Sequence, residues 1–584
     1  MTTPTPAPAA VPARPDGRVP FDLAEIPFST RGAWTDVSPV VGLHETADHL
    51  HLVSHRNGLT GVLQLSLWAR GREVEVPMVA DSSVLTWSSP DGTVEAVHDG
   101  PEVLRFRGGG LALRLTDAAT ELTPFTGTYL YEDLAAQAFC FTSYETGQRY
   151  RLTVLAGEVA AEGVEALGES PRWVEVASAG QEAWEIAVEE FPTTRTSFVP
   201  TRSFDDAVAG ADQDFGAWLE RVAPWRTAAT PAADRAAYVL WSATVAPEGF
   251  LARESVLMSM HWMDKVWSWD HCFNALALAP GDPRAALHQF LAPFDHQTPE
   301  GALPDSIAHS ELLYNYVKPP IHGWALARLL PSLDLTADEL QEVHDRLAAW
   351  TRFWLEHRVA PGRTAAHYQH GNDSGWDNAT TFDLDRVVEG PDLAAFLVLQ
   401  LGVVRDLALR LGRDDEAATW DAARRVQLGA LEGMWDGRAY RATAPRTGRR
   451  STSTSLLALM PLVLGDELDA GRRAALCALV DEHLTEWGLA TERPDSAAYE
   501  ADGYWRGPIW APSTVLLEDG LRRAGFVDRA DRVSASFRRL CEASGFAENF
   551  DALTGQGLRD RAYTWTASAY LLLAAEAAER EAVA

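Results

Sequence analysis

Four segments in the second half of the sequence combine tryptophan, glycine and acidic residues in a way that suits ligand chemistry. They are MHWMDKVWSWDHCFNAL (260–276), HYQHGNDSGWDNATTFD (367–383), EADGYWRGPIWAPST (500–514) and GFAENFDALTGQGLRDRAYTW (545–565). The flat carbon–hydrogen faces of a sugar ring pack on aromatic rings, while its hydroxyl groups bond to carboxylates, amides and arginine. Together the segments predict a carbohydrate site on loops.

The first part of the chain predicts a domain rich in β-strands. From about residue 40 to 200, apolar and polar residues alternate in short runs such as GVLQLSLW (61–68) and AWEIAVEE (183–190), with turn residues between them. Period-two alternation is typical of antiparallel strands with one buried face. We therefore expect an antiparallel β-sandwich over residues 26–203, preceded by a disordered N-terminal tail over residues 1–25.

The rest of the chain has the periodicity of helices. One amphipathic pattern covers residues 205–222, so residues 204–230 are predicted as a helical linker. From residue 231 onward, segments such as ADELQEVHDRLAAWTRFWLEHR (337–358) repeat apolar residues at every third or fourth position. A helix with its loop takes roughly 30 residues here, which leaves room for about a dozen helices. We expect one large helical domain over residues 231–584.

The charge of the chain limits its partners. The sequence has 584 residues with 82 acidic and 50 basic side chains, and its formal net charge is −32. Nucleic acids and anionic membranes bind proteins mainly through lysine and arginine, so neither is an expected partner. An acidic surface also disfavours anionic ligands, and the expected partner is therefore a neutral small molecule. The sequence makes no prediction of the oligomeric state.

The N-terminal sequence MTTPTPAPAAVPARPDGRVP lacks the apolar stretch of a signal peptide, and no window approaches 18 consecutive apolar residues. The expected location is the cytoplasm. The four cysteines are far apart and match no zinc-binding spacing, so we expect reduced core residues and no metal site. They are Cys140, Cys272, Cys477 and Cys541.

Several of these segments resemble signature segments of glycoside hydrolase family 63. That family holds processing α-glucosidase I, bacterial α-glycosidases and the hydrolases of mannosylglycerate and glucosylglycerate. The similar segments, in family order, are WSWDHCFNALAL (267–278), YVKPPIHGWAL (316–326), DSGWDNAT (373–380), YWRGPIWAPS (504–513) and ENFDALTG (548–555). The resemblance implies an (α/α)6 barrel with an N-terminal β-sandwich, an inverting mechanism and no cofactor.

The resemblance also implies two catalytic residues. In the family, the aspartate that closes the SGxD segment is the general acid, and the glutamate that opens the ENY-like segment is the general base. By position these are Asp377 and Glu548. An inverting enzyme holds such a pair about 6.5–9.5 Å apart so that a water molecule fits against the sugar.

The two roles set opposite electrostatic requirements. The acid must keep its proton near neutral pH, and burial beside Trp376 or the charge of Asp373 would raise its pKa. The base must stay ionised, and a cation such as Arg506 or Arg559 would lower its pKa.

We expect seven residues to form the walls of the sugar site: Trp269, Asp270, Asp373, Trp376, Trp505, Arg506 and Trp510. The alternative for each is a structural role, such as capping a helix at Asp270 or packing at a helix start for the aromatic residues. The chain also departs from the family pattern, with Phe550 where tyrosine is usual and Ala379-Thr380 where Ser-Pro is typical. These departures affect the details of the subsites and leave the reaction type unchanged.

The leading hypothesis is therefore an exo-acting, inverting α-glycoside hydrolase, an α-glucosidase acting on a small α-glucoside or oligosaccharide. Three alternatives stay open. A hydrolase of mannosyl- or glucosylglycerate would need cations for the glycerate carboxylate. A disaccharide phosphorylase shares the same layout but needs a phosphate site. A carbohydrate-binding protein without catalysis would bind the same ligands with no turnover.

Overall fold

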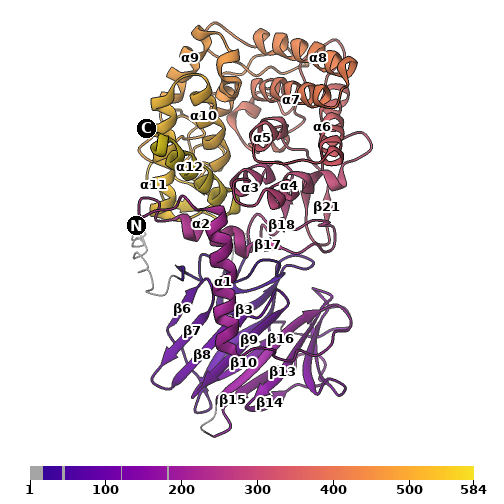
Figure 1. Ribbon diagram of the computed structural model, residues 1–584, viewed down its shortest axis with the longest axis vertical. Helices are drawn as coiled ribbons and strands as arrows, with labels where there is room; N and C mark the ends of the chain where they lie inside the picture. Colours follow the sequence, from indigo (N-terminus) through magenta and orange to yellow (C-terminus); the bar gives the residue numbers. More distant parts are fainter. Residues whose placement is uncertain (1–17, 43–45, 120, 181–182, 584) are drawn as a thin grey trace. The chain divides into compact units, whose positions relative to one another are not determined.

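The computed structural model describes residues 18–42, 46–119, 121–180 and 183–583. Within this part, the chain forms two compact units (Figure 1). The first unit runs to Glu220 and includes the short later segments Trp241–Ala246 and Met260–Asp264. The second unit contains the remaining chain to the C-terminus.

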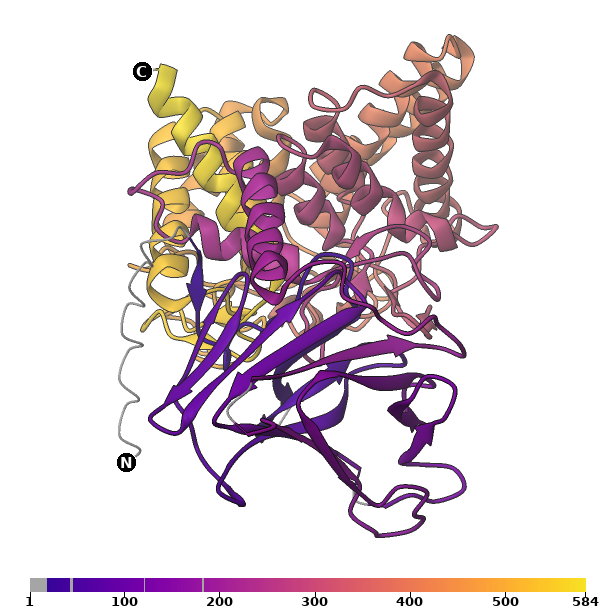
Figure 2. The ribbon, with the colours of Figure 1, turned by 60° about the horizontal axis from the view of Figure 1, so that its bottom comes forward.

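The first unit is built from two antiparallel sheets, which confirms the expected β-sandwich (Figure 2). One sheet has nine strands in the order β1-β6-β7-β8-β9-β16-β13-β12-β11, and the other has the order β14-β15-β10-β4-β3-β2 with β5 paired to β4. The strands are β1 (Pro20–Phe21), β2 (Thr35–Val41), β3 (Thr46–Ser54), β4 (Thr60–Ala69), β5 (Arg72–Glu73), β6 (Met78–Asp81), β7 (Leu85–Ser89), β8 (Gly92–His98), β9 (Val103–Gly109), β10 (Ala112–Asp117), β11 (Thr128–Asp133), β12 (Ala138–Ser143), β13 (Arg149–Ala156), β14 (Glu158–Glu162), β15 (Trp173–Ala177) and β16 (Trp184–Phe191).

Alternating burial explains why these segments form strands. In β10, Leu113 and Leu115 are buried and pair with Leu67 and Leu65 of β4, while Arg114 between them is only partly buried. One apolar face per strand packs into the core and the other meets solvent, as the period-two pattern predicts.

The predicted disordered tail and linker differ from the structure in their details. Residues 1–17 of the tail lie outside the described residues, but Pro20–Phe21 form β1 and pair with β6. Helix α1 (Phe204–Val222) occupies the predicted helical segment. Its first turns pack Phe204, Ala207 and Val208 against Val84 and Val97, so α1 shares the core of the β-sandwich.

The second unit is helical. Its α-helices are α2 (Ala233–Ser242), α3 (His271–Leu278), α4 (Pro283–Leu291), α5 (His322–Leu329), α6 (Ala337–His357), α7 (Pro391–Arg410), α8 (Asp414–Gly433), α9 (Ala470–Asp481), α10 (Ala511–Arg523), α11 (Val527–Ser544) and α12 (Thr564–Val583). The 3-10 segments are η1 (Ala292–His296), η2 (Gly371–Ser374), η3 (Thr380–Asp383) and η4 (Leu456–Glu467). Short strands lie in the loops: β18 (Ser255–Val256), β19 (Val266–Trp267), β20 (Ser306–Ile307), β21 (Leu312–Leu313), β22 (Asn549–Phe550) and β23 (Gly557–Leu558). A further short strand, β17 (Thr244–Val245), belongs to the first unit.

Six of these elements close into a ring. Contacts run from α3 to α5, α7, η4, α10 and α12, and from α12 back to α3. The inner elements are apolar on most sides: all eight residues of α3 are buried, whereas α8 buries only four of its 20. This difference is expected when one layer of helices encloses another, and it confirms the (α/α)6 barrel.

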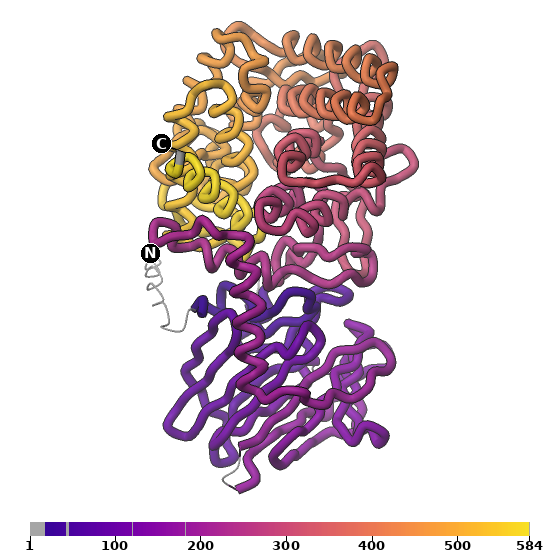
Figure 3. Tube along the Cα trace, in the orientation of Figure 1, coloured from indigo at the N-terminus to yellow at the C-terminus, as the bar shows by residue number. Residues whose placement is uncertain are grey.

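Long and short connections alternate around this ring (Figure 3). Each of the first five inner elements is followed by a short connection to an outer helix, as between α7 and α8 at residues 411–413. Each inner element is preceded by a long loop, and six such loops end before α3, α5, α7, η4, α10 and α12. Because every short connection reverses the chain, the inner elements run in the same direction. The six long loops therefore meet at one end of the ring.

Candidate active site

The predicted acid, Asp377, lies on the third long loop just after η2. The loop turns at Gly375, whose φ of +73° lies in the left-handed region that favours glycine. A Cβ atom at Gly375 would also come within 2.5 Å of the Trp269 ring. Glycine at this position therefore lets the loop lie directly against Trp269.

Asp377 is partly buried, and its environment favours a proton. Burial raises the pKa of Asp377, and the negative charge of Asp305 adds to this rise. Lys318 and His370 lower the pKa and partly offset it. Asp305 therefore supplies the negative charge that the sequence analysis expected from Asp373.

Asp373 fastens the loop to its neighbours. Its Oδ2 lies 2.7 Å from Nη1 of Arg358 and accepts a hydrogen bond from the Gln369 amide at 2.8 Å. Its Oδ1 accepts from the Val317 amide at 3.1 Å, and the side chain is buried. Both oxygens of this predicted wall residue are thus engaged by the protein itself.

Asp270, Asp305 and Lys318 form a buried charged group from the first two long loops. The Lys318 ammonium lies 2.9 Å from Oδ1 of Asp305 and donates to the Asn372 carbonyl at 3.0 Å. Lys318 is one of only two lysines in the chain, and it stands in the segment YVKPPIHGWAL (316–326) that resembles the family. Asp305 carried no such signal.

Asp270 has an unused carboxylate oxygen. It precedes α3 but does not cap it, and among the described residues its Oδ2 has no hydrogen-bond partner. Burial raises its pKa well above the usual range, with further contributions from Asp305 and Asp377, while Lys318 opposes the rise. A buried polar atom without a partner is costly, so this oxygen suits a ligand hydroxyl.

The predicted base, Glu548, lies directly before the short strand β22 on the sixth long loop. Phe550 of β22 exchanges backbone hydrogen bonds with Ile509 at 2.7 and 3.0 Å, which ties this strand to the fifth loop. Glu548 is buried, and neither carboxylate oxygen has a hydrogen-bond partner in the described part of the chain.

The surroundings of Glu548 differ from the expectation of an ionised base. Burial, together with the charge of Asp560, raises the pKa of Glu548 to about 8. Arg559 and the Tyr504 hydroxyl act in the opposite direction but are outweighed. The expected cation is thus present in Arg559, yet burial is the stronger effect.

Arg506, the other cation expected near Glu548, contacts the third long loop. Its Nε donates to the Asn378 carbonyl at 2.8 Å, and its guanidinium pairs with Asp383. These contacts tie the fifth long loop to the third, so Arg506 supports the loop that carries Asp377.

Tyr504, which the sequence analysis did not select, lies near both predicted catalytic residues. Burial raises the pKa of its phenol well above the usual range, and the charges of Glu548 and Asp377 both contribute. The Arg559 guanidinium carbon lies 5.0 Å from the centre of its ring. Tyr504 and Arg559 also have left-handed φ angles of 63° and 61°, which are uncommon outside glycine.

The four predicted tryptophans come together in one buried cluster. Trp505 stacks on Trp510 with ring centres 4.0 Å apart and lies 4.6 Å from Trp376. Trp269 lies 6.5 Å from Trp505, and Trp565 completes the cluster 5.5 Å from Trp510. Residues from three long loops and the start of α12 therefore share one aromatic core beside the carboxylates.

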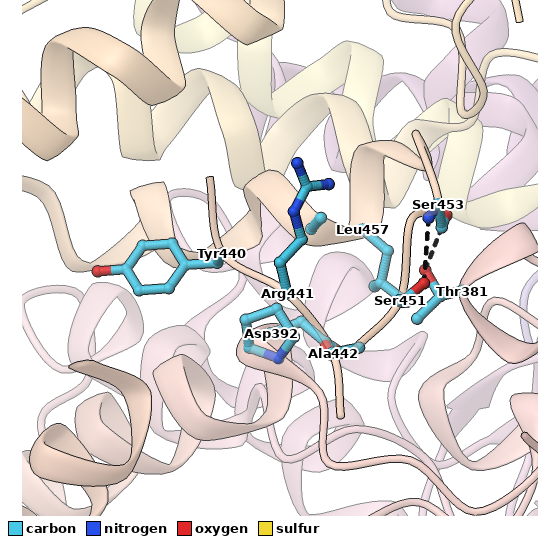
Figure 4. A pocket seen from close by; sticks show the side chains of 10 residues that line it. Thr381, Asp392, Tyr440, Arg441, Ala442, Ser451, Ser453 and Leu457 are labelled. Atoms are coloured by element: carbon cyan, nitrogen blue, oxygen red, sulfur yellow. Dashed lines mark hydrogen bonds between the residues drawn. The ribbon is translucent and has the colours of Figure 1, made fainter. Parts of the chain in front are cut away.

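A small cavity lies beside the third and fourth long loops, and the residues that line it do not include Asp377 or Glu548 (Figure 4). Its lining includes Thr381, Asp392, Arg441 and Ser453, and Thr381 bonds to Ser453. Its volume of 10 Å³ is room for about one water molecule and is far below the size of a sugar site.

Over the ranges that the structure describes, no group of three or more histidine, cysteine or acidic side chains is arranged to hold a metal ion. None of the helices in the same ranges is long and apolar enough to cross a membrane.

Comparisons with known proteins identify the family of the chain. The family described as "Mannosylglycerate hydrolase MGH1-like glycoside hydrolase domain" matches residues 263–566. A mannosylglycerate hydrolase of Rubrobacter radiotolerans is 23% identical over 426 residues, covering 56% of this chain and 96% of that protein. A glucosylglycerate hydrolase of Mycolicibacterium hassiacum is 22% identical over 450 residues, covering 59% and 97%.

Two solved structures share the fold. A family 63 mannosylglycerate hydrolase of Thermus thermophilus superposes with a TM-score of 0.52 at 22% identity, covering 59% of this chain and 99% of that one. A bacterial glucoamylase, solved with acarbose, has a TM-score of 0.62 at 10% identity and covers 99% and 96%.

The fold and the family match together define a glycoside hydrolase. The chain belongs to the mannosylglycerate hydrolase MGH1-like group of glycoside hydrolase family 63.

Proposed function

We propose that the protein is an exo-acting, inverting α-glycoside hydrolase in which Asp377 is the general acid and Glu548 the general base. The observation that carries this proposal is the pair itself. Two carboxyl groups with raised pKa values come from separate loops at one end of the ring, and they occupy the family's acid and base positions. The phenol of Tyr504 interacts electrostatically with both of them.

In the proposed reaction, protonated Asp377 donates its proton to the glycosidic oxygen as the bond to the sugar breaks. Glu548 accepts a proton from a water molecule that attacks the opposite face of the sugar. The products are an alcohol and a sugar of inverted anomeric configuration. Asp377 then regains a proton from solvent, and Glu548 loses one. Active enzyme therefore carries the proton on Asp377 and none on Glu548.

The neighbouring residues suit a single sugar ring. The free oxygen of Asp270 would accept a bond from a sugar hydroxyl, and the tryptophan cluster would form the apolar floor. Glu548 must lose its proton for each turnover, and Arg559 favours this step by stabilising the carboxylate.

The substrate we propose is a small α-glycoside of glucose or mannose. The relatives are named for mannosylglycerate and glucosylglycerate, which favours glyceric acid as the leaving group. This preference runs against the neutral ligand expected from the net charge of −32. Arg559, which lies over the Tyr504 ring and is partly exposed, is a cation at hand for a carboxylate.

Substrate and stereochemistry can be measured together. The wild-type protein is incubated with α-glucosylglycerate, α-mannosylglycerate and neutral α-glucosides, and NMR follows the anomer released first. Release of the β-anomer without added phosphate supports the proposal. Retention of configuration, a requirement for inorganic phosphate, or binding without turnover would each contradict it.

The two roles can be separated by the leaving group. On an α-glycoside that the wild-type protein hydrolyses, Asp377→Asn and Glu548→Gln should each lower kcat by roughly 100- to 10,000-fold. On a glycosyl fluoride of the same sugar, fluoride leaves without a proton, so Asp377→Asn should recover most of its activity while Glu548→Gln should not.

Asp415→Asn, at the exposed start of α8, is the matched control and should behave as wild type. Full activity in both site variants would overturn the assignment. If Glu548→Gln recovered activity on the glycosyl fluoride and Asp377→Asn did not, the roles of acid and base would be exchanged.

A further inference from the structure

Asn378, the residue directly after the proposed acid, uses both ends of its side-chain amide on the neighbours of Tyr504. Its Nδ2 donates to the Gly503 carbonyl at 3.0 Å, and its Oδ1 accepts from the Trp505 amide at 3.0 Å. The amide therefore spans Tyr504 from the residue before it to the residue after it.

This arrangement allows only one orientation of the amide. The carbonyl of Gly503 requires a donor, and the backbone N–H of Trp505 requires an acceptor. Asparagine supplies both from one rigid planar group. Aspartate at position 378 has the same shape but would place a second oxygen against the Gly503 carbonyl.

Tyr504 has a backbone that needs such support. Its φ of 63° lies in the left-handed region, which costs a residue with a Cβ atom roughly 1–2 kcal/mol. The Trp510 indole donates to the Tyr504 carbonyl at 2.9 Å, so hydrogen bonds hold the peptide groups on both sides of this residue. Strained residues persist where their surroundings hold them from several directions.

Two other contacts hold Asp377 to the same segment. On one side of it, Trp376 packs on Trp505 with ring centres 4.6 Å apart. On the other side, Asn378 accepts from Arg506 through its backbone carbonyl at 2.8 Å. The acid therefore lies between two residues that are both joined to the segment around Tyr504.

We propose that Asn378 is a positioning residue that fixes the Tyr504 hydroxyl relative to Asp377 and Glu548. It does so by holding Tyr504 in its left-handed backbone conformation. The inference rests on the proposed function, because it assumes that the space between these two carboxyl groups is where the reaction occurs.

A double-mutant cycle tests this inference. Tyr504→Phe removes the hydroxyl and keeps the ring, whereas Asn378→Ala releases the backbone on both sides. Misplacement of a reacting group by about 1 Å can cost roughly 100-fold, so Asn378→Ala should lower kcat by about 10- to 100-fold with a much smaller change in KM. In the Tyr504→Phe background, the same change should lower kcat by less than about threefold, because residues that act through one contact are not additive.

Two further variants serve as controls. Asn378→Asp keeps the size and one hydrogen bond, and it should lose kcat about as much as alanine does; it also replaces Asn378→Ala in the cycle if that variant does not fold. Asn315→Ala, in an exposed part of the second long loop, should leave kcat unchanged.

Two results would overturn the inference. One is that the losses of the single variants multiply in the double variant. The other is that Asn378→Ala lowers the melting temperature while kcat stays at the wild-type value. Failure of the proposed function is distinguishable, because it would appear as unchanged turnover in Asp377→Asn and Glu548→Gln.

Discussion

At the residue scale, Glu548 shows how burial and catalysis make opposite demands. A base must lose its proton, yet Glu548 is buried with no hydrogen-bond partner on either oxygen among the described residues, and its pKa is raised to about 8. Burial disfavours the ionised carboxylate, because a buried charge loses its hydration. The environment of Glu548 therefore favours the protonated, inactive form of the base near neutral pH.

Asp560→Asn should make Glu548 a better base at low pH. The charge of Asp560 raises the pKa of Glu548, so removing that charge lowers it. Because the base acts when ionised, kcat/KM should begin to rise at a lower pH, by roughly tenfold at a fixed acidic pH for each unit of pKa shift. The measurement is the pH profile of kcat/KM, with the exposed Asp528→Asn on α11 as control. A shift to higher pH would contradict the prediction.

Glu548→Gln should stabilise the protein in alkali while it abolishes turnover. The pKa of Glu548 is about 8 in the folded chain against 4.5 for the free side chain. A raised carboxyl pKa gives stability that is complete below pH 4.5 and is lost as pH rises to about 8. The variant lacks this loss, so its free energy of unfolding at about pH 8.5 should exceed the wild-type value by at most about 5 kcal/mol.

Thermal unfolding at two pH values checks this second prediction. The difference between variant and wild type should be small at about pH 4.5, where the folded wild-type side chain is neutral, and clear at about pH 8.5. A variant that is less stable than wild type at the higher pH would show that the carboxylate is stabilised by the fold.

The sequence predicted part of the site at this scale. Asp377, Glu548, Asp270 and the tryptophans stand in segments with a recognisable order, and the structure brings them to one end of the ring. Asp305, Tyr504 and Asn378 were missed because their importance depends on which loops meet. Spacing along the chain carries no information on that point, and a tyrosine with a left-handed backbone looks like any other tyrosine in the sequence.

At the element scale, the third long loop depends on the absence of a side chain at one position. Gly375 lies against the Trp269 ring, and a Cβ atom there would come within 2.5 Å of it. The contact between Gly375 and Trp269 therefore fixes the position of the third long loop, which carries Asp377.

Gly375→Ala should lower activity far more than Gly362→Ala. Both glycines have positive φ, at 73° and 77°, so both substitutions carry the same backbone strain. A Cβ atom at Gly362 would meet nothing within 4 Å, whereas one at Gly375 would push against Trp269. We expect a loss of kcat of about tenfold or more for Gly375→Ala and little change for Gly362→Ala, from paired kinetic and unfolding measurements. Equal kcat values would show that the contact with Trp269 has no part in positioning.

Long helices with a clear amphipathic period could be predicted from the sequence, whereas short buried helices could not. Residues 205–222 and 337–358 were predicted as helices, and they correspond to α1 and α6. The short helix α3 begins inside a segment that was predicted as a loop, since its eight buried residues show no amphipathic period. The inner element η4 was missed because it is almost entirely apolar and contains Pro461.

At the scale of the whole molecule, the ring separates connections that build the site from connections that only reverse the chain. Residues 411–413 join α7 to α8 and contain no site residue, and Gly412 has open space around it. A protease site inserted at Gly412 should therefore be cut with kcat kept within about threefold, as the inner ring stays intact.

The same insertion after Gly503, in the fifth long loop, should abolish activity even before cleavage. Activity assays of both insertion proteins before and after the protease provide the measurement. Loss of activity on cutting at Gly412 would show that the α7–α8 connection is needed to hold the ring closed.

The overall class was also accessible from the sequence, because two different periodicities divide the chain and the family segments occur in order. The pairing order of the strands in the two large sheets could not be predicted from the sequence, since it depends on contacts between distant segments. The segments 241–246 and 260–264, which belong to the first unit, were likewise assigned to the helical domain, where their positions in the sequence place them.

The order of the loops has a geometric consequence for the proposed reaction. The loop of Asp377 is the third of six around the ring, and the loop of Glu548 is the sixth. In a closed ring of six, the third and sixth positions lie diametrically opposite each other. A sugar held on the axis would therefore meet the acid on one side and the activated water on the other. On this view the approach of the two carboxyl groups from opposite sides is a property of the sixfold ring, and moving either carboxylate to an adjacent loop would turn its approach by about one sixth of a full rotation.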